Sequence, residues 1–127
     1  MKKLIAFLAA AFIAIPAMAD SEYPDISINE LKKAIEEKKV AVIDVNGSSS
    51  YAKGHVPTAI DFAAAKSDLA SKLPSDKGTL VVAYCGGPTC SAYKKAANAA
   101  KELGYTNVKH LSAGISGWLQ AGEKTEK

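Results

Sequence analysis

Two short runs of continuously apolar residues stand out in the pattern of hydrophobic and polar positions. They cover residues 40–45 and 79–84, and both are rich in β-branched side chains. A strand that is buried on both faces of a parallel sheet shows such a run instead of a strict alternation. Residues 59–62 and 107–111 can form two further short strands.

Helical spacing fills the segments between these runs. Ser27 to Glu30 has the Ser-x-x-Glu form of a capping box, and apolar residues then recur at helical intervals. Three later segments have a helical character: residues 63–72, 91–103 and 115–121. Gly104 is a typical residue for ending the second of them. Strands that alternate with helices predict an α/β fold with a parallel sheet covered on both faces.

The first nineteen residues follow a different pattern. Two lysines precede an apolar stretch at 4–15, Pro16 interrupts it, and residues 17–19 supply small side chains for cleavage. This pattern is typical of a secretory signal peptide, and it is shorter than the roughly 20 apolar residues of a membrane span. We therefore expect residues 20–127 to form the mature domain, which is periplasmic and has no stable membrane anchor.

Size and charge restrict the function further. A body of about 108 residues holds one domain with a modest core. Removing Lys2 and Lys3 lowers the formal charge from +3 to +1, which gives no basic surface for nucleic acid. All 16 basic residues are lysine, so the planar two-pronged recognition of anions by arginine is absent. We expect a monomer. The charged residues 123–127 need not be ordered.

The two cysteines, Cys85 and Cys90, lie in one loop that directly follows the strand at 79–84. Gly86 and Gly87 allow the backbone to curl, so that successive amides and the next helix can face the Cys85 sulfur. This cradle predicts a displayed thiol that is held as the nucleophilic thiolate. A bond between the two cysteines would close a very short loop and stabilise the fold little. We therefore interpret the pair as reactive and not structural.

Four stretches, in their order and spacing, resemble a single-domain rhodanese over about residues 26–122. They are VAVIDVN (40–46), GHVPTAIDF (54–62), VVAYCGGPTCSAYKKAA (81–97) and LSAGISGWLQAG (111–122). The resemblance implies a three-layer α/β sandwich around a five-stranded parallel sheet. It also implies a catalytic cysteine that heads a six-residue loop and carries a sulfane sulfur as a persulfide, without a metal or an organic cofactor.

The resemblance also assigns individual residues. Cys85 matches the sulfur-carrying cysteine, and Asp44 and His55 match positions that hold the architecture near the site. The remaining residues of the active-site loop are Gly86, Gly87, Pro88, Thr89, Cys90 and Ser91.

Two positions depart from the family pattern. Cys90 stands where members that use thiosulfate often have arginine, and Asn46 stands where an arginine commonly follows the Asp-Val of the earlier strand. A thiosulfate dianion would have to be held by backbone amides and by Lys94 or Lys95. Pro88 has no N–H, which removes one donor from the cradle.

Several roles remain open at this stage. Cys90 can be a resolving thiol, a small residue in the place of an arginine, or half of a disulfide with Cys85. His55 can act as a general base, but we expect an architectural role for it and for His110. Trp118 is expected to anchor the last helix in the core. The histidines and cysteines do not have the paired spacing of a zinc site.

The sequence thus predicts a sulfurtransferase. Cys85 accepts a sulfane sulfur from a small donor and passes it to a thiophilic acceptor such as cyanide or a thiol, while loop amides stabilise the charged sulfur. One alternative is a thiol redox module that uses Cys85 and Cys90, although the spacing is not Cys-x-x-Cys. Another is a catalytically silent rhodanese-fold binding domain.

Overall fold

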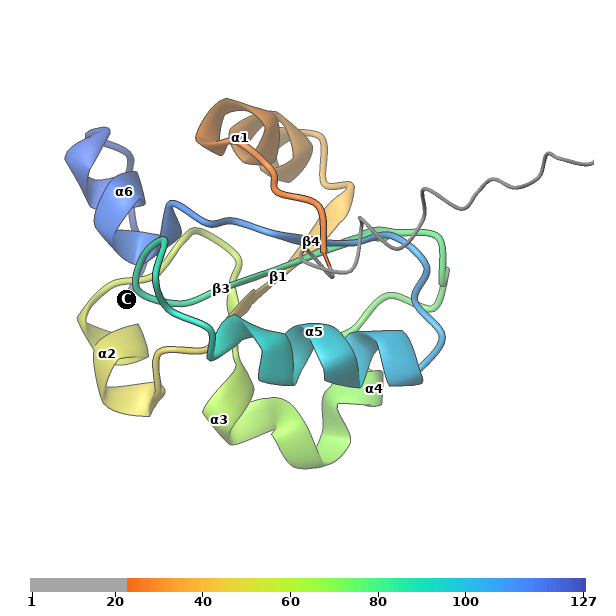
Figure 1. Cartoon of the computed structure of the whole chain (residues 1–127). Coiled ribbons are helices and arrows are strands. Elements are labelled where there is room, and N and C mark those ends of the chain that lie inside the picture. The colour runs from red at the N-terminus through yellow and green to blue at the C-terminus, as the bar shows by residue number, and fades with distance from the viewer. Residues whose placement is uncertain (1–22) are drawn as a thin grey trace, which may run out of the picture.

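The computed structural model describes residues 23–127, and the predicted signal peptide lies outside them. A parallel sheet lies between two layers of helices, as Figure 1 shows. One face is covered by α3 (Phe62–Ala65), α4 (Leu69–Lys72) and α5 (Tyr93–Glu102). The other face is covered by α1 (Ile28–Glu36) and α6 (Gly114–Gln120), with α2 (Ser48–Lys53) beside the strand ends. Within residues 23–127, no helix combines the length and hydropathy needed to span a membrane.

The sheet has four strands in the described part of the chain, in the order β2-β1-β3-β4. They are β1 (Val40–Asp44), β2 (Ile60–Asp61), β3 (Leu80–Tyr84) and β4 (Val108–His110). Every pairing is parallel, and the register sets Asp44 opposite Tyr84 and Ile43 opposite Ile60. The carboxyl ends of the strands therefore meet at one edge, where the loops after β1 and β3 lie close together.

The prediction of five strands is wrong in number, while the parallel α/β architecture is confirmed. Beside β4, Asp25 forms an isolated parallel bridge with His110. His110 donates its N–H to the Pro24 carbonyl, and Ile26 donates to the His110 carbonyl, both at 2.9 Å. Pro24 has no N–H of its own, so it cannot extend this ladder. The segment stops at a bridge instead of forming a fifth strand.

Alternating residues of the central strands face two separate cores. Val81, Ala83 and Cys85 point toward α5, where they pack with its alanines. Val82 and Tyr84 point the other way, toward α1 and α6. Both faces of β3 are thus buried, which is why the strand reads as a continuous apolar run.

The helix boundaries largely follow the sequence signals. In α1 the capping box is present: Glu30 N–H donates to Ser27 Oγ at 3.0 Å, and Ser27 N–H donates to Glu30 Oε1 at 3.1 Å. The segment at 63–72 is less regular than predicted, because a 3-10 turn at Lys66–Asp68 separates α3 from α4. There Asp68 leaves helical geometry and its carbonyl accepts the Ser71 hydroxyl at 2.8 Å.

The charged tail packs against the fold, contrary to the expectation that it need not be ordered. His55 and Glu126 exchange two backbone hydrogen bonds of 2.9 Å, and the Glu126 carboxylate accepts from Thr58 N–H at 2.9 Å. Trp118, buried as expected, donates its indole N–H to the Lys124 carbonyl at 2.7 Å. The tail thereby ties α6 to the turn that follows α2.

Candidate active site

Cys85 is the first residue after β3, and it continues the inward alternation of Val81 and Ala83. Its side chain is only 1% exposed and packs in the core beneath α5. The prediction of a displayed thiol is therefore wrong for this state. The cause is the strand period, which turns every second residue toward α5 and continues from Val81 and Ala83 to Cys85, just beyond the end of β3.

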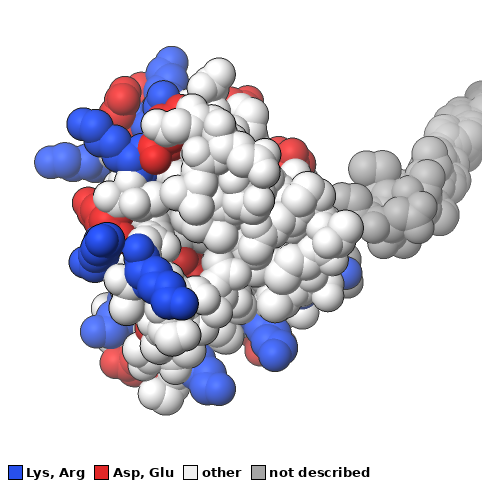
Figure 2. Space-filling model, turned by 90° about the vertical axis from the view of Figure 1, so that its left-hand side faces the viewer, with Lys and Arg blue, Asp and Glu red and all other residues white. Residues whose placement is uncertain are grey.

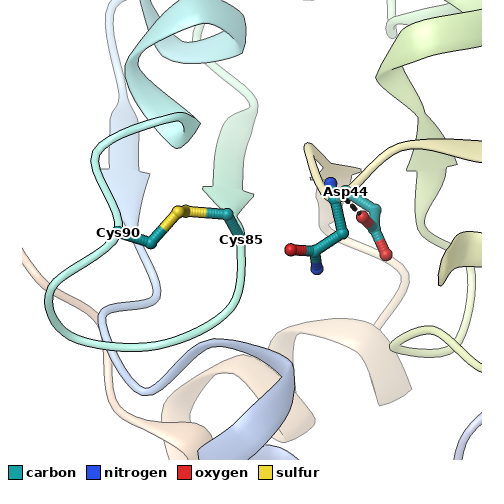
Figure 3. Close-up of a disulfide and its surroundings, with 4 residues drawn as sticks. Asp44, Cys85 and Cys90 are labelled. Atoms are coloured by element: carbon teal, nitrogen blue, oxygen red, sulfur yellow. Dashed lines mark hydrogen bonds between the residues drawn. A yellow bond between two sulfur atoms is a disulfide. The ribbon is translucent and has the colours of Figure 1, made fainter.

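A disulfide joins Cys85 to Cys90, and Figure 3 shows it crossing the loop from the strand end to the outer limb. The two Cα atoms are 6.3 Å apart, within the range that a bridge requires. Of the three possibilities for Cys90, the structure contains the disulfide. Cys90 is partly exposed, in contrast to Cys85, so the two halves of this bond lie in different surroundings.

A β-turn brings Cys90 back toward Cys85. The Cys90 N–H donates to the Gly87 carbonyl at 3.1 Å, with Pro88 and Thr89 between them. Proline suits the second position of such a turn because its φ is already fixed. The turn engages the Cys90 amide, which is therefore not free to face the Cys85 sulfur. The loop amides left for the sulfur cradle belong to Gly86, Gly87, Thr89 and Ser91.

The start of α6 holds the other limb of the loop. Ile115 N–H donates to the Cys85 carbonyl and Ser116 N–H to the Gly86 carbonyl, both at 3.0 Å. The first amides of a helix have no partner within the helix, so the loop carbonyls satisfy them. Gly114 makes this contact possible, because a Cβ there would lie 2.5 Å from the Gly86 carbonyl carbon.

Asp44 organises the neighbouring strand end from the opposite face of the sheet. It is 1% exposed; Oδ1 accepts from Asn46 N–H at 2.8 Å and Oδ2 accepts the Tyr84 hydroxyl at 2.6 Å. Val56 N–H donates to that hydroxyl at 3.0 Å. Burial and the bond to Asp44 raise the pKa of Tyr84, so it stays a donor. The contacts of Asp44 fix the loops after β1 and α2.

Uncharged side chains lie beside the cysteine loop. A Cβ on Gly86 would lie 3.9 Å from Asn46 Oδ1, and one on Gly87 would lie 3.9 Å from Ser116 Cβ. Figure 2 views the molecule from the side of α2 and α6, where charged side chains gather along one edge and leave a broad uncharged surface. Lys94 and Lys95 are exposed on the first turn of α5. The loop therefore has polar but neutral neighbours in Asn46 and Ser116.

The two histidines are occupied elsewhere. The His55 ring stacks on Tyr51 at 3.6 Å between centroids, and its Nδ1 contacts the Tyr51 carbonyl at 2.8 Å. The His110 ring stacks on Tyr93 at 3.4 Å, and its buried Nε2 has no hydrogen-bond partner in the described residues. Burial lowers the pKa of His110. Among residues 23–127, no three His, Cys, Asp or Glu side chains group as a metal site.

Sequence reasoning missed two residues that shape this site. Gly114 lies in one of the four family-like stretches, and its place just before the helix predicted at 115–121 was a signal that a backbone approaches closely there. Tyr84 looked like an ordinary apolar strand residue, and nothing local indicates that its hydroxyl links Asp44 to Val56. In the chain, Tyr84 lies 40 positions from Asp44 and 28 positions from Val56.

The geometry is that of a cysteine at the carboxyl end of a central parallel strand, heading a tight loop before a helix. A family model described as the rhodanese-like domain matches residues 27–121, which include both cysteines. The chain belongs to the family of rhodanese-like domains. This rhodanese-like domain thus extends from the capping box of α1 to the end of α6.

Known relatives of this rhodanese-like domain differ in kind. It is 29% identical over 104 residues to the thiosulfate sulfurtransferase GlpE of Shewanella oneidensis, an alignment that covers 80% of this chain and 97% of that protein. It is 32% identical over 116 residues to an HTH-type transcriptional regulator of Mycobacterium tuberculosis, covering 91% of this chain. The alignment spans half the length of that regulator.

Solved structures agree with the fold. The BH2092 protein of Bacillus halodurans is 26% identical, with a TM-score of 0.64, and the match covers 89% of this chain and 83% of that one. A thiosulfate sulfurtransferase of Pseudomonas aeruginosa is 23% identical with a TM-score of 0.66, covering 86% of this chain and 21% of that one. The second likeness concerns the fold of this rhodanese-like domain alone.

Proposed function

We propose that this protein is a sulfurtransferase that carries a sulfane sulfur as a persulfide on Cys85 and passes it to a thiophilic acceptor, cyanide or a thiol. The position of Cys85 supports this most directly. It heads a loop at the carboxyl edge of the sheet, where parallel α/β folds carry their function. The family includes proteins named as sulfurtransferases.

The reaction takes two displacement steps. The Cys85 thiolate attacks the terminal sulfur of the donor, the donor's own bond to that sulfur breaks, and Cys85 keeps the sulfur as a persulfide. Cyanide then attacks this outer sulfur, leaves as thiocyanate, and returns the Cys85 thiolate. The amides of Gly86 and Gly87 are the nearest backbone donors in the sequence for the charged sulfur. No cofactor takes part in either step.

A donor with little negative charge suits this loop better than thiosulfate. Cys90 and Asn46 replace the two arginines expected by resemblance, and the side chains beside Gly86 and Gly87 are uncharged. A dianion would lose the paired, charge-assisted hydrogen bonds that a guanidinium supplies. We propose a neutral polysulfide or another sulfane donor of low charge as the substrate class.

The disulfide supports one competing function. A thiol redox module would alternate between the Cys85–Cys90 disulfide and the dithiol, with no sulfur atom transferred. In the sulfurtransferase, the disulfide is an oxidised resting state that a thiol must reduce before sulfur is accepted. The two functions therefore differ in whether Cys85 gains a sulfur after reduction.

Mass spectrometry of the intact protein separates these functions. The reduced protein, freed of reductant, is mixed with polysulfide and then with cyanide. We expect a gain of about one sulfur atom that cyanide removes as thiocyanate, and Cys85→Ser should abolish both because it removes the nucleophile. A protein that gains no sulfur and returns to the disulfide is a redox module, and a protein that stays reduced without sulfur is a silent domain.

The setting of the reaction is also part of the proposal. The signal-peptide pattern at residues 1–19 supports a periplasmic enzyme, in which a disulfide can persist. We further propose that it acts as a monomer on small molecules and binds no nucleic acid, since the mature charge is close to zero.

A further inference from the structure

The two sulfurs of the disulfide differ in their access to solvent. Cys85 is 1% exposed and belongs to the core formed with Tyr93, Ala96 and Ala97. Cys90 is partly exposed, and Thr89 before it is exposed. Figure 3 shows Cys90 on the outer limb of the loop and Cys85 at the strand end. The Cys85–Cys90 disulfide therefore runs from a buried sulfur to one nearer the solvent.

This polarity decides which sulfur an external thiol can attack. In thiol–disulfide exchange a thiolate attacks one sulfur and expels the other, so access and the leaving group both set the direction. Attack on Cys85 would require approach through the packed side of the loop beneath α5. Attack on Cys90 comes from the exposed side, and the group expelled is Cys85.

The thiolate that this attack leaves on Cys85 has backbone amides close to it in the chain. Gly86 and Gly87 follow Cys85 directly, and α5, a helix of ten residues, begins after the loop. Backbone amides and the positive end of a helix stabilise a thiolate. Cys90, by contrast, has its own amide engaged in the turn to Gly87.

We propose that Cys90 is the entry site for small thiols and becomes S-thiolated. A small thiolate forms a bond to Cys90 Sγ, the Cys85–Cys90 bond breaks, and its electron pair stays on Cys85 as a thiolate. A second thiolate then attacks the sulfur of the small molecule, forms a free disulfide and releases the Cys90 thiolate. Cys90 packs partly against the core beneath α5, so a small thiol reaches its sulfur more easily than a bulky one does.

This inference rests on the proposed function in taking Cys85 as the sulfur carrier. It adds that the first thiol frees the carrier directly, while Cys90 is still capped. Cys90 cannot attack a persulfide on Cys85 as long as the cap remains. The S-thiolated protein is therefore the form in which Cys85 accepts sulfur without losing it to Cys90.

The test uses glutathione as the small thiol and contains no sulfur donor, so its outcome is separate from that of the persulfide assay. The oxidised full chain is mixed with glutathione, quenched with acid and alkylated with N-ethylmaleimide. Trypsin cleaves after Lys77 and Lys94 and gives one peptide with both cysteines, which fragmentation can distinguish. We expect glutathione on Cys90 and maleimide on Cys85, in about tenfold excess over the reverse.

The same reaction in urea is the matched control, because unfolding exposes both sulfurs and should remove the preference. Equal labelling in the folded protein, or glutathione mainly on Cys85, would overturn the proposal. If the disulfide closes again before the quench, single-cysteine variants decide. Glutathione should leave Cys90 in Cys85→Ser about tenfold faster than it leaves Cys85 in Cys90→Ser, because access controls the attack. Equal or reversed rates would contradict the inference.

Discussion

At the scale of single residues, Cys90 shows how one substitution changes the chemistry of a loop. By resemblance an arginine is expected at this position, where it would bind the oxygens of an anionic donor. The structure instead has a cysteine whose sulfur is joined to Cys85 in a disulfide. The turn from Gly87 to Cys90 makes this possible, because it reverses the loop within four residues. The position therefore offers no charged side chain to an anion and instead places a second sulfur beside Cys85.

Cys90→Ser should lengthen the lifetime of a persulfide on Cys85. In the wild type, a Cys90 thiolate can attack the inner sulfur of the protonated persulfide, form the disulfide and release hydrosulfide. The observed bond indicates that the two side chains converge. Hydrosulfide release and protein mass, followed after the donor is removed, measure both lifetimes. Thr89→Ser, next to Cys90, is the matched control and should behave as the wild type.

Identical lifetimes in Cys90→Ser and the wild type, with no disulfide formed, would contradict this prediction. Cys90 would then be a small residue that bonds to Cys85 under oxidising conditions but takes no part in the catalytic cycle.

At the scale of elements, α6 and the cysteine loop depend on one glycine. Gly114 has a φ of 63°, and a Cβ there would meet the Gly86 carbonyl group at 2.5–2.6 Å. Gly122 has a similar φ of 79° but no atom within 4 Å of such a Cβ. The two glycines therefore separate backbone strain from the close contact between α6 and the loop.

Gly114→Ala should destabilise the fold and displace the loop, whereas Gly122→Ala should only destabilise it slightly. The left-handed backbone costs alanine about 1 kcal/mol at either position, and the clash at Gly114 adds about 1 to 3 kcal/mol. Urea unfolding measures both variants, and the rate at which glutathione opens the disulfide reports on the loop. Equal effects of the two substitutions would mean that the cysteine loop moves away from the added Cβ at little cost in free energy.

The contact between β4 and α5 should make stability depend on pH. His110 stacks on Tyr93; Asp25 and Lys94 are the charged groups that act on it, and burial lowers its pKa. The unfolded chain then binds a proton at higher pH than the fold does. This contribution to stability is complete above the ordinary pKa of about 6.5 and is lost as the pH falls below it.

His110→Phe keeps a ring against Tyr93 but cannot take up a proton. Urea unfolding at several pH values between 7.5 and 5 should show a smaller loss of stability in this variant than in the wild type. An unchanged slope would assign the pH dependence to other groups.

The elements were predictable where their signals are local. Ser27 and Glu30 mark the start of α1, and the apolar run before Cys85 marks β3. The burial of Cys85, the four-stranded sheet of residues 23–127 and the break near Asp68 were not predicted. The first depends on which face of β3 meets α5, and the second on Pro24 next to the bridging residue. Such features follow from tertiary contacts, which local patterns do not contain.

At the scale of the whole molecule, the tail connects distant parts of the fold. It pairs with His55, caps the N–H of Thr58 and accepts the Trp118 indole N–H, and Glu123 forms a 3.0 Å ion pair with Lys32 on α1. The sequence pattern indicated only a charged segment. Apart from the bond between Trp118 and Lys124, these contacts arise between residues far apart in the chain, so a local charge pattern could not predict them.

Deleting residues 123–127 should lower the free energy of unfolding by about 2 to 4 kcal/mol, because several hydrogen bonds with typical net values near 1 kcal/mol are lost together. Deleting Lys127 alone is the control and should change it little. Chemical unfolding measures both. A full deletion as stable as the control would show that the tail contacts contribute nothing net.

The core position of Cys85 affects how easily its sulfur is oxidised irreversibly. Thiolates exposed to peroxide pass through sulfenic acid to sulfinic and sulfonic acids, and the last of these cannot be reversed. A sulfur that is already bonded to Cys90 and covered by the core beneath α5 is shielded from this sequence. Under the proposed function, the disulfide therefore protects the nucleophilic sulfur from irreversible oxidation between catalytic cycles, and reduction by a thiol returns it to the thiolate form.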